Sequence, residues 1–181
     1  MQPDQAIFLR DFLLPQLRSE QIVTARVISA VPSDRNDFRP DPKCFSAFGL
    51  SWHMVLCEFW VLDAVIHRRF GEFDPRPAEL KTCADIASWY PKQFAQRLPL
   101  LESLSGEHLA TPIDFHGLRN DPAVAYLNIA IRHSVHHRGQ LSTYLRAIGA
   151  HVPAIYVESA DEPWPPEPGS TSAAPASPPA F

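Results

Sequence analysis

Residues 121–149, DPAVAYLNIAIRHSVHHRGQLSTYLRAIG, carry the clearest helix signals in the 181-residue chain. Asp121 is suited to cap the N-terminus, Pro122 to occupy the first turn, and Gly149 to stop the helix. A helix of this length spans roughly 40 Å. Positions spaced by three or four form one buried face with two histidines in it: Tyr126, Ala130, His133, His137, Leu141, Tyr144 and Ile148.

Upstream of this segment, the sequence favours three more long helices, at about 15–30, 46–70 and 82–103. Pro15 fits a first helical turn and disfavours helix just before it, so a separate short N-terminal helix is expected. Ser46 is the expected N-cap of the second helix and Gly71 its stop signal. Pro91 and Pro99 are expected to kink or split the third helix. No stretch shows convincing strand alternation, so the expected fold class is all-α, a four-helix bundle.

One domain is expected over residues 1–162. The remaining segment, PWPPEPGSTSAAPASPPAF at 163–181, holds seven of the nineteen prolines, with Gly, Ser and Ala between them. Such a segment buries too little apolar surface to offset its ordering entropy. We therefore expect a disordered tail.

Charge and cysteine content exclude several classes of protein. The net charge is −4 and the basic residues are spread singly along the chain, so nucleic-acid binding is not expected. Cys44, Cys57 and Cys83 form neither an even set nor a CxxC pair, which favours reduced thiols in the cytoplasm. Neither a signal peptide nor a run of 18 uncharged apolar residues is visible, so no membrane association is expected.

The helix expected at 46–70 repeats the histidine pattern, because His53 shares a stripe with Leu50, Cys57, Trp60 and Ala64. If both stripes face the bundle interior, three imidazoles can converge. A buried polar group without a partner costs about 1 to 3 kcal/mol, and neither stripe offers an acidic residue. A divalent cation satisfies all three rings, because an i, i+4 histidine pair and a third histidine form an open tripod with bonds of about 2.0 to 2.1 Å.

Several alternatives remain open at this point. The histidines could be buried without metal, as in a pure interaction module. Cys57 could be a fourth ligand that closes the site, or a small buried hydrophobe. Gln140 could hydrogen-bond a ligand ring and form a polar wall, or bond between helices. Arg138 is expected to make a structural ion pair or reach a dimer partner, and Gly139 to permit close helix approach.

Three motifs resemble the DinB/YfiT-like metalloenzymes: HSVHHRGQLSTYLRAIGAHVPAIY, the DFRPDPK loop before residue 46, and the SADEP run after residue 158. The likeness covers roughly residues 5–163. It implies a four-helix bundle with a divalent metal held by His53, His133 and His137. It also implies a homodimer, and an activity such as that of transferases and isomerases using low-molecular-weight thiols, for example bacillithiol or mycothiol.

Three neutral ligands leave the double charge of the ion available, so a bound water or thiol would be acidified. The function expected is a metal-dependent enzyme that activates a low-molecular-weight thiol or water for transfer to, or hydrolysis of, a small electrophile. The rival is a non-catalytic stress-response protein in which the three-histidine site is structural. Zinc is the metal expected first, with nickel or iron next, because imidazole suits all of them.

Overall fold

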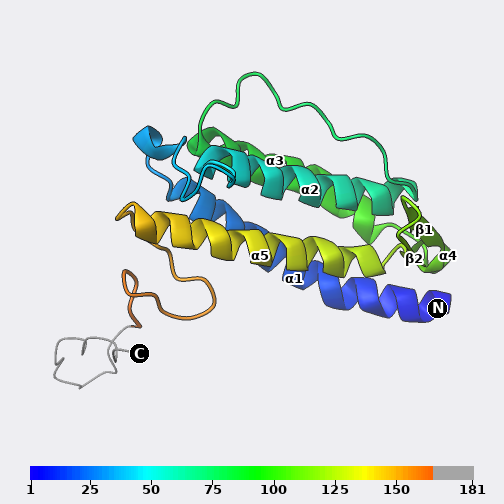
Figure 1. Ribbon diagram of the computed structural model, residues 1–181. Helices are drawn as coiled ribbons and strands as arrows, with labels where there is room; N and C mark the ends of the chain where they lie inside the picture. Colours follow the sequence, from blue (N-terminus) through cyan, green and yellow to red (C-terminus); the bar gives the residue numbers. More distant parts are fainter. Residues whose placement is uncertain (165–181) are drawn as a thin grey trace, which may run out of the picture.

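Four long helices lie side by side in the computed structural model, which describes residues 1–164 (Figure 1). They are α1 (Pro3–Ser29), α2 (Ala47–His67), α3 (Cys83–Glu102) and α5 (Ala125–Ala147). Helices α1 and α2 each pack against both α3 and α5, which closes a four-helix bundle and confirms the expected fold. The shorter elements are the 3-10 helix η1 (Ser33–Arg35), α4 (Gly106–Ala110), β1 (Pro112–Phe115) and β2 (Arg119–Pro122).

Helix α2 is the most apolar of the four. By length and hydropathy it is the one helix within residues 1–164 that could cross a membrane. More than half of its most apolar window is buried in the bundle, against α3 and α5. We therefore assign it as the core helix of the bundle, as its sequence indicates.

Helix α1 corrects the expected break at Pro15, because it continues through that residue without interruption. A proline inside a helix removes one hydrogen bond and costs about 3 kcal/mol. Leu13, Leu14 and Leu17 are buried in the core on either side of it. Burying each leucine contributes roughly 1.5 to 3 kcal/mol, so packing outweighs the local penalty.

Helix α3 also runs unbroken, so the expected split at Pro91 and Pro99 is wrong, whereas a kink at these residues stays a prediction. Its N-terminus is fixed by a capping box, in which the Thr82 hydroxyl accepts from the backbone N–H of Asp85. This cap and the burial of side chains along the helix hold it together across both prolines.

The two ends of α2 differ in how well the sequence predicts them. Ser46 is the N-cap, as expected, and its hydroxyl accepts from the backbone N–H of Gly49. The C-terminus lies at His67, three residues earlier than expected, because Arg68 adopts the left-handed conformation (φ 56°) that ends the helix before Gly71.

The start of α5 is the largest correction. Asp121 and Pro122 do not cap it, because they lie in strand β2, which pairs antiparallel with β1. The helix starts at Ala125 without a side-chain cap. These strands, PIDF and RNDP, are short and hold prolines, which explains why no alternation is visible in the sequence. At the other end, Gly149 follows the helix with φ 69°, as expected.

After α5 the chain turns back and packs along the bundle. Arg26 of α1 forms an ion pair with Glu162, and Arg146 of α5 forms one with Asp161. The expected disordered tail falls almost wholly on residues 165–181, outside the described residues, so it stays a prediction, as does the domain boundary at 162.

Candidate metal centre

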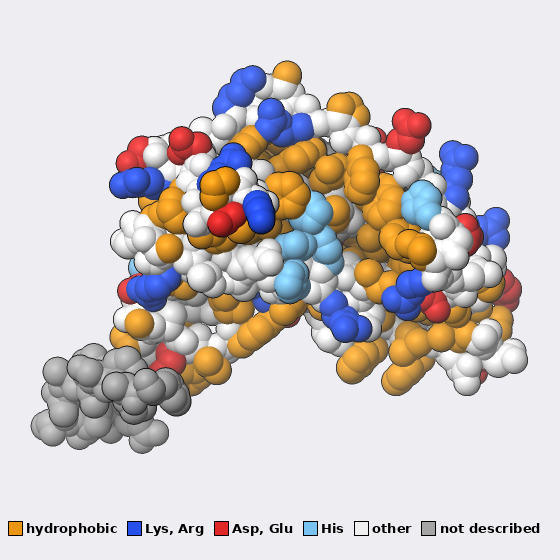
Figure 2. All heavy atoms as spheres, viewed as in Figure 1, with side chains coloured by type: hydrophobic (Ala, Val, Ile, Leu, Met, Phe, Trp, Pro, Cys, Tyr) orange, Lys and Arg blue, Asp and Glu red, His pale blue; other side chains and the backbone are white. Residues whose placement is uncertain are grey.

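The three histidines singled out in the sequence meet on one face of the bundle. His53 comes from α2, and His133 and His137 come from successive turns of α5. The Nε2 atom of His53 lies 3.2 Å from Nε2 of His133 and 3.2 Å from Nε2 of His137. The three ligand atoms all lie within 4.8 Å of one another. Figure 2 shows histidine side chains gathered on this face among hydrophobic ones.

This spacing fits a shared ion. Tetrahedral bonds of about 2.0 to 2.1 Å hold ligand nitrogens roughly 3.3 Å apart. Hydrogen bonding alone does not satisfy the cluster, because a ring nitrogen carries either one proton or one lone pair. Nε2 of His53 can therefore pair with only one of its two neighbours. The residues present thus fit a divalent cation better than a set of mutually hydrogen-bonded rings.

The rings are poised to be neutral. Burial lowers the pKa of His133 to about 4, helped by the nearby rings of His137 and His53. Burial and His137 also lower the pKa of His53, and burial lowers the pKa of His137. At pH 7 the three imidazoles therefore hold lone pairs rather than positive charge, as metal ligation requires.

Gln140 lies where the sequence placed it, beside a proposed ligand. Nδ1 of His137 donates to Oε1 of Gln140 at 2.7 Å. The proton on Nδ1 leaves Nε2 with its lone pair directed at the other two histidines. The amide nitrogen of Gln140 donates in turn to Nε2 of the exposed His136 at 3.3 Å. Gln140 therefore fixes the tautomer of His137. His133 has no equivalent partner, because its Nδ1 atom is buried without a hydrogen bond within residues 1–164.

Cys57 lies next to His53, one turn further along α2. Its Sγ atom is 3.5 Å from Nδ1 and 3.9 Å from Nε2 of His53. Burial raises the pKa of this thiol to about 11, so it is protonated at neutral pH when no metal is bound. The group that could hold a metal contains the three histidines without Cys57. This placement favours the half-buried thiol over a fourth ligand.

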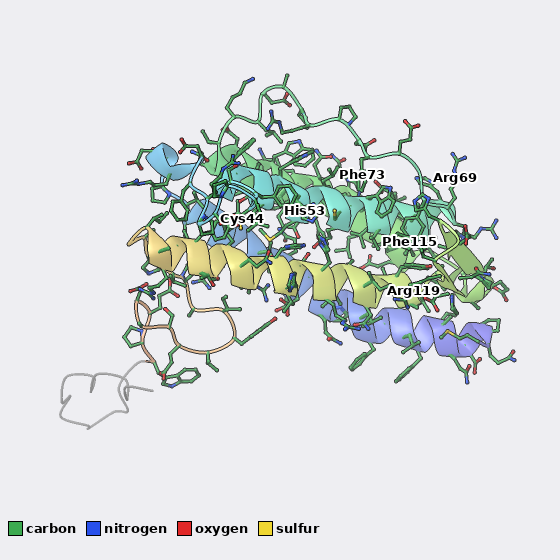
Figure 3. All side chains as sticks on the ribbon, viewed as in Figure 1. Cys44, His53, Arg69, Phe73, Phe115 and Arg119 are labelled. Carbon is green, nitrogen blue, oxygen red and sulfur yellow. The ribbon has the colours of Figure 1, made fainter. Side chains whose placement is uncertain are left out.

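An aromatic residue covers part of the outer side. The ring of Phe45 stacks on that of His53, with 5.1 Å between centroids, and the Tyr144 hydroxyl donates to the Phe45 backbone carbonyl at 3.2 Å. His53 itself projects from α2 toward α5 (Figure 3). All three histidines remain half-buried, so solvent and small molecules can reach the cluster from outside.

Sequence reasoning missed a buried carboxylate next to the cluster. Glu58 of α2 is 1% exposed and accepts hydrogen bonds from the Tyr90 hydroxyl and the Ser134 hydroxyl, each at 2.6 Å. Burial raises its pKa to about 7, although both hydrogen bonds and Arg138 act in the opposite direction. The available signal was an acidic residue, Glu58, near the middle of the apolar run SWHMVLCEFWVLDAVI, since a buried carboxylate needs partners.

The two remaining residues of the HRGQ motif behave differently from each other. Arg138 is 1% exposed and forms an ion pair with Glu20 of α1 at 2.5 Å, which confirms the expected structural ion pair. Gly139 does not permit a close helix approach, because a Cβ atom there would meet nothing within 4 Å. The expectation for Gly139 is therefore wrong.

A sizeable cavity lies elsewhere in the bundle. It measures about 700 Å³ and lies between α2, α3 and the 69–77 segment. Trp52, Trp60 and Trp89 line it, and none of the three clustered histidines does. We give more weight to the histidine cluster as the chemical centre, since it holds the converging donor atoms.

Comparison with known proteins gives consistent matches. The DinB family model matches residues 10–168. The uncharacterized protein YjoA of Bacillus subtilis (strain 168) is 24% identical over 134 residues, which is 72% of this chain and 85% of that protein. The crystal structure of DinB-like YjoA from Bacillus subtilis has a TM-score of 0.67 at 21% identity, covering 79% of this chain and 96% of that one. A DinB-like protein from Bacillus cereus ATCC 10987 has a TM-score of 0.67 at 25% identity, with coverages of 80% and 95%.

Proposed function

This chain belongs to the DinB family, and from that premise we propose that it binds a divalent metal ion through His53, His133 and His137 and acts as a metal-dependent enzyme. The observation that carries the proposal is the approach of three neutral Nε2 atoms, with His53 3.2 Å from each of the other two. The proposed reaction activates a low-molecular-weight thiol or water for transfer to, or hydrolysis of, a small electrophilic substrate.

The protein's own residues have separable tasks in this proposal. A bound divalent cation would supply Lewis acidity, which lowers the pKa of a water or thiol. The three imidazoles hold their lone pairs ready because burial keeps them neutral. Gln140 keeps the proton of His137 on Nδ1. Phe45 shields one side of His53 from water, while the half-buried rings leave an approach for a small molecule.

Zinc is the metal we propose first. Three nitrogen donors, with His53 3.2 Å from each of the other two, suit Zn²⁺ in a site that keeps an open position. Nickel and iron accept the same donors. The metal content of protein purified from cells grown with each metal separates these choices.

We also propose a cytoplasmic homodimer. The three cysteines are free thiols, which fits a reducing compartment. Phe8, Phe12 and Ile22 of α1 are 68%, 60% and 59% exposed, which is unusual for large apolar side chains on one helix. Sedimentation equilibrium tests the dimer directly.

The metal proposal is tested on purified full-length protein by elemental analysis and zinc titration. We expect about one ion per chain, lost in His133→Ala and in His137→Ala. His67→Ala is the matched control, because His67 is an exposed histidine at the end of α2 and should leave binding unchanged. A wild-type protein that retains no metal and binds none would overturn the proposal.

The enzymatic part is tested separately. Metal-replete and chelator-treated protein are assayed against panels of thiol-transfer and hydrolysis substrates. We expect turnover that disappears with the metal and returns when it is added back. Tight metal binding without any metal-dependent turnover would instead favour a structural three-histidine site.

A further inference from the structure

We infer that the buried ionisable residues Glu58 and Arg138 are positioning residues, which hold the two histidines of α5 in the orientation that meets His53. The inference rests on the proposed metal binding of that site. It concerns residues that touch neither metal nor substrate and act through the helix that carries the ligands.

The positions of these residues along α5 suggest the role. Ser134 follows His133 and Arg138 follows His137, so the pair repeats the four-residue spacing of the ligands. Consecutive helical residues point about 100° apart, so the ligand stripe and the Ser134/Arg138 stripe lie next to each other. The second stripe is fully buried, whereas the histidines are half-buried. Each ligand thus has an inward-facing neighbour.

The first contact joins three helices. The Ser134 hydroxyl of α5 donates to Oε2 of Glu58 on α2, and the Tyr90 hydroxyl of α3 donates to Oε1 of the same carboxylate. Both distances are 2.6 Å. Because α2 carries His53 and α5 carries His133 and His137, this contact joins the two helices that supply the proposed ligands. The contact fixes the position of α5 along its own axis relative to His53.

The second contact holds α5 against a different helix. Arg138 forms an ion pair with Glu20 of α1, and its Nη1 donates to the Thr24 hydroxyl at 3.2 Å. Its Nη2 donates to the Tyr156 hydroxyl at 2.6 Å. Two contacts one turn apart, to α2 and to α1, leave α5 little freedom to rotate about its axis.

Rotation is the movement to which the metal site is most sensitive. The Cα atoms lie about 2.3 Å from a helix axis, and an imidazole nitrogen extends to roughly 7 Å. A rotation of α5 by about 10° therefore moves these nitrogens by roughly 1 Å, whereas metal–ligand distances tolerate about 0.2 Å. Apolar packing is non-directional and controls rotation less strictly than hydrogen bonds do.

Stability alone is a poor reason to bury these groups. Replacing buried charged or polar networks with apolar residues of similar volume is often neutral or stabilising. If these residues instead specify one arrangement of the helices, removing the hydrogen bonds of Glu58 together should weaken metal binding without lowering the stability of the fold.

The test is a triple variant, Glu58→Met, Tyr90→Phe and Ser134→Ala, which removes the hydrogen bonds without leaving a buried partner unsatisfied. We expect a melting temperature equal to or above that of the wild type without metal, and zinc affinity weaker by about 10- to 100-fold. Glu58→Gln should keep affinity within about threefold, because an amide accepts from one hydroxyl and donates to the other. The control Asp63→Asn with Arg97→Gln breaks an α2–α3 ion pair that does not involve α5, and should leave zinc affinity unchanged.

Each outcome decides the inference. Equal zinc affinity in the folded triple variant and the wild type would overturn it while leaving the proposed function intact. A parallel loss of stability and affinity would also overturn it, because that result describes structural damage only. If the triple variant does not fold, the same variant with Glu58→Leu in place of Glu58→Met is measured with the same readouts, and a loss of folding there too assigns the network to stability and overturns the inference. If the wild type binds no zinc, the inference fails together with the proposed function.

Discussion

Glu58→Gln should abolish one component of the pH dependence of stability. In the folded protein, burial raises the pKa of Glu58 from an ordinary 4.5 to about 7. Below about pH 4.5 the carboxyl is protonated in both the folded and the unfolded chain, so it adds no penalty. Between these two values the unfolded chain releases the proton while the folded chain keeps it. The free energy of unfolding therefore falls as pH rises.

The size of the effect follows from the two pKa values. A rise from 4.5 to about 7 corresponds to about 3 kcal/mol at 1.36 kcal/mol per pKa unit. The loss develops between pH 4.5 and 7 and stays constant above pH 7, where both states are ionised. Glutamine does not titrate, so the variant lacks this component.

The assay is urea unfolding of metal-free protein, followed by far-UV circular dichroism at pH 5, 6, 7 and 8. Subtracting the free energy of unfolding of the wild type from that of the variant removes the contribution of every group that titrates in both proteins, including the histidines. We expect the variant to gain about 2.5 kcal/mol relative to the wild type on going from pH 5 to pH 8, because part of the loss is already present at pH 5. A difference that does not vary with pH would show that Glu58 is ionised in the folded protein throughout, and would refute the reasoning.

Four further perturbations have defined outcomes. Zinc at about 100 times its dissociation constant should raise the melting temperature of the wild type by about 5 to 10 °C, as measured by calorimetry, and should leave His137→Ala unchanged. Gln140→Ala should weaken zinc binding about 10-fold in a competition titration, since His137 loses the acceptor that sets its tautomer. Gly106→Ala should destabilise the fold by about 1 to 3 kcal/mol in urea unfolding, because its Cβ would lie 2.5 Å from the backbone oxygen of Pro3. Gly139→Ala, where the space is open, should instead stabilise the helix by about 1 kcal/mol, and a loss of stability there would contradict this.

The parts of the site that depend on local spacing could be predicted from the sequence. His133 and His137 are one turn apart in any helix, and His53 occupies a stripe of the same kind. Gln140 is within reach of His137 for the same reason. The all-helical bundle also follows from periodicity, because each long segment has a buried face of helical period.

The parts that depend on tertiary context could not be predicted in this way. Pro15 remains inside α1 because neighbouring leucines are buried, which the local rules for proline do not consider. Asp121 has the chemistry of a helix cap but pairs within a strand instead. Glu58 and Ser134 are 76 residues apart, and only the packing of α2 on α5 brings them together.

The gathering of Trp52, Trp60 and Trp89 around the cavity between α2 and α3 affects how the protein can be studied. The chain has four tryptophans, so three of its four indole rings lie at that cavity. Emission wavelength should therefore report on molecules that enter the cavity or displace the 69–77 segment. Zn²⁺ has a filled d shell, and the three histidines proposed to bind it do not line the cavity. A zinc titration followed by intrinsic fluorescence should therefore stay almost flat even while the three histidines become saturated.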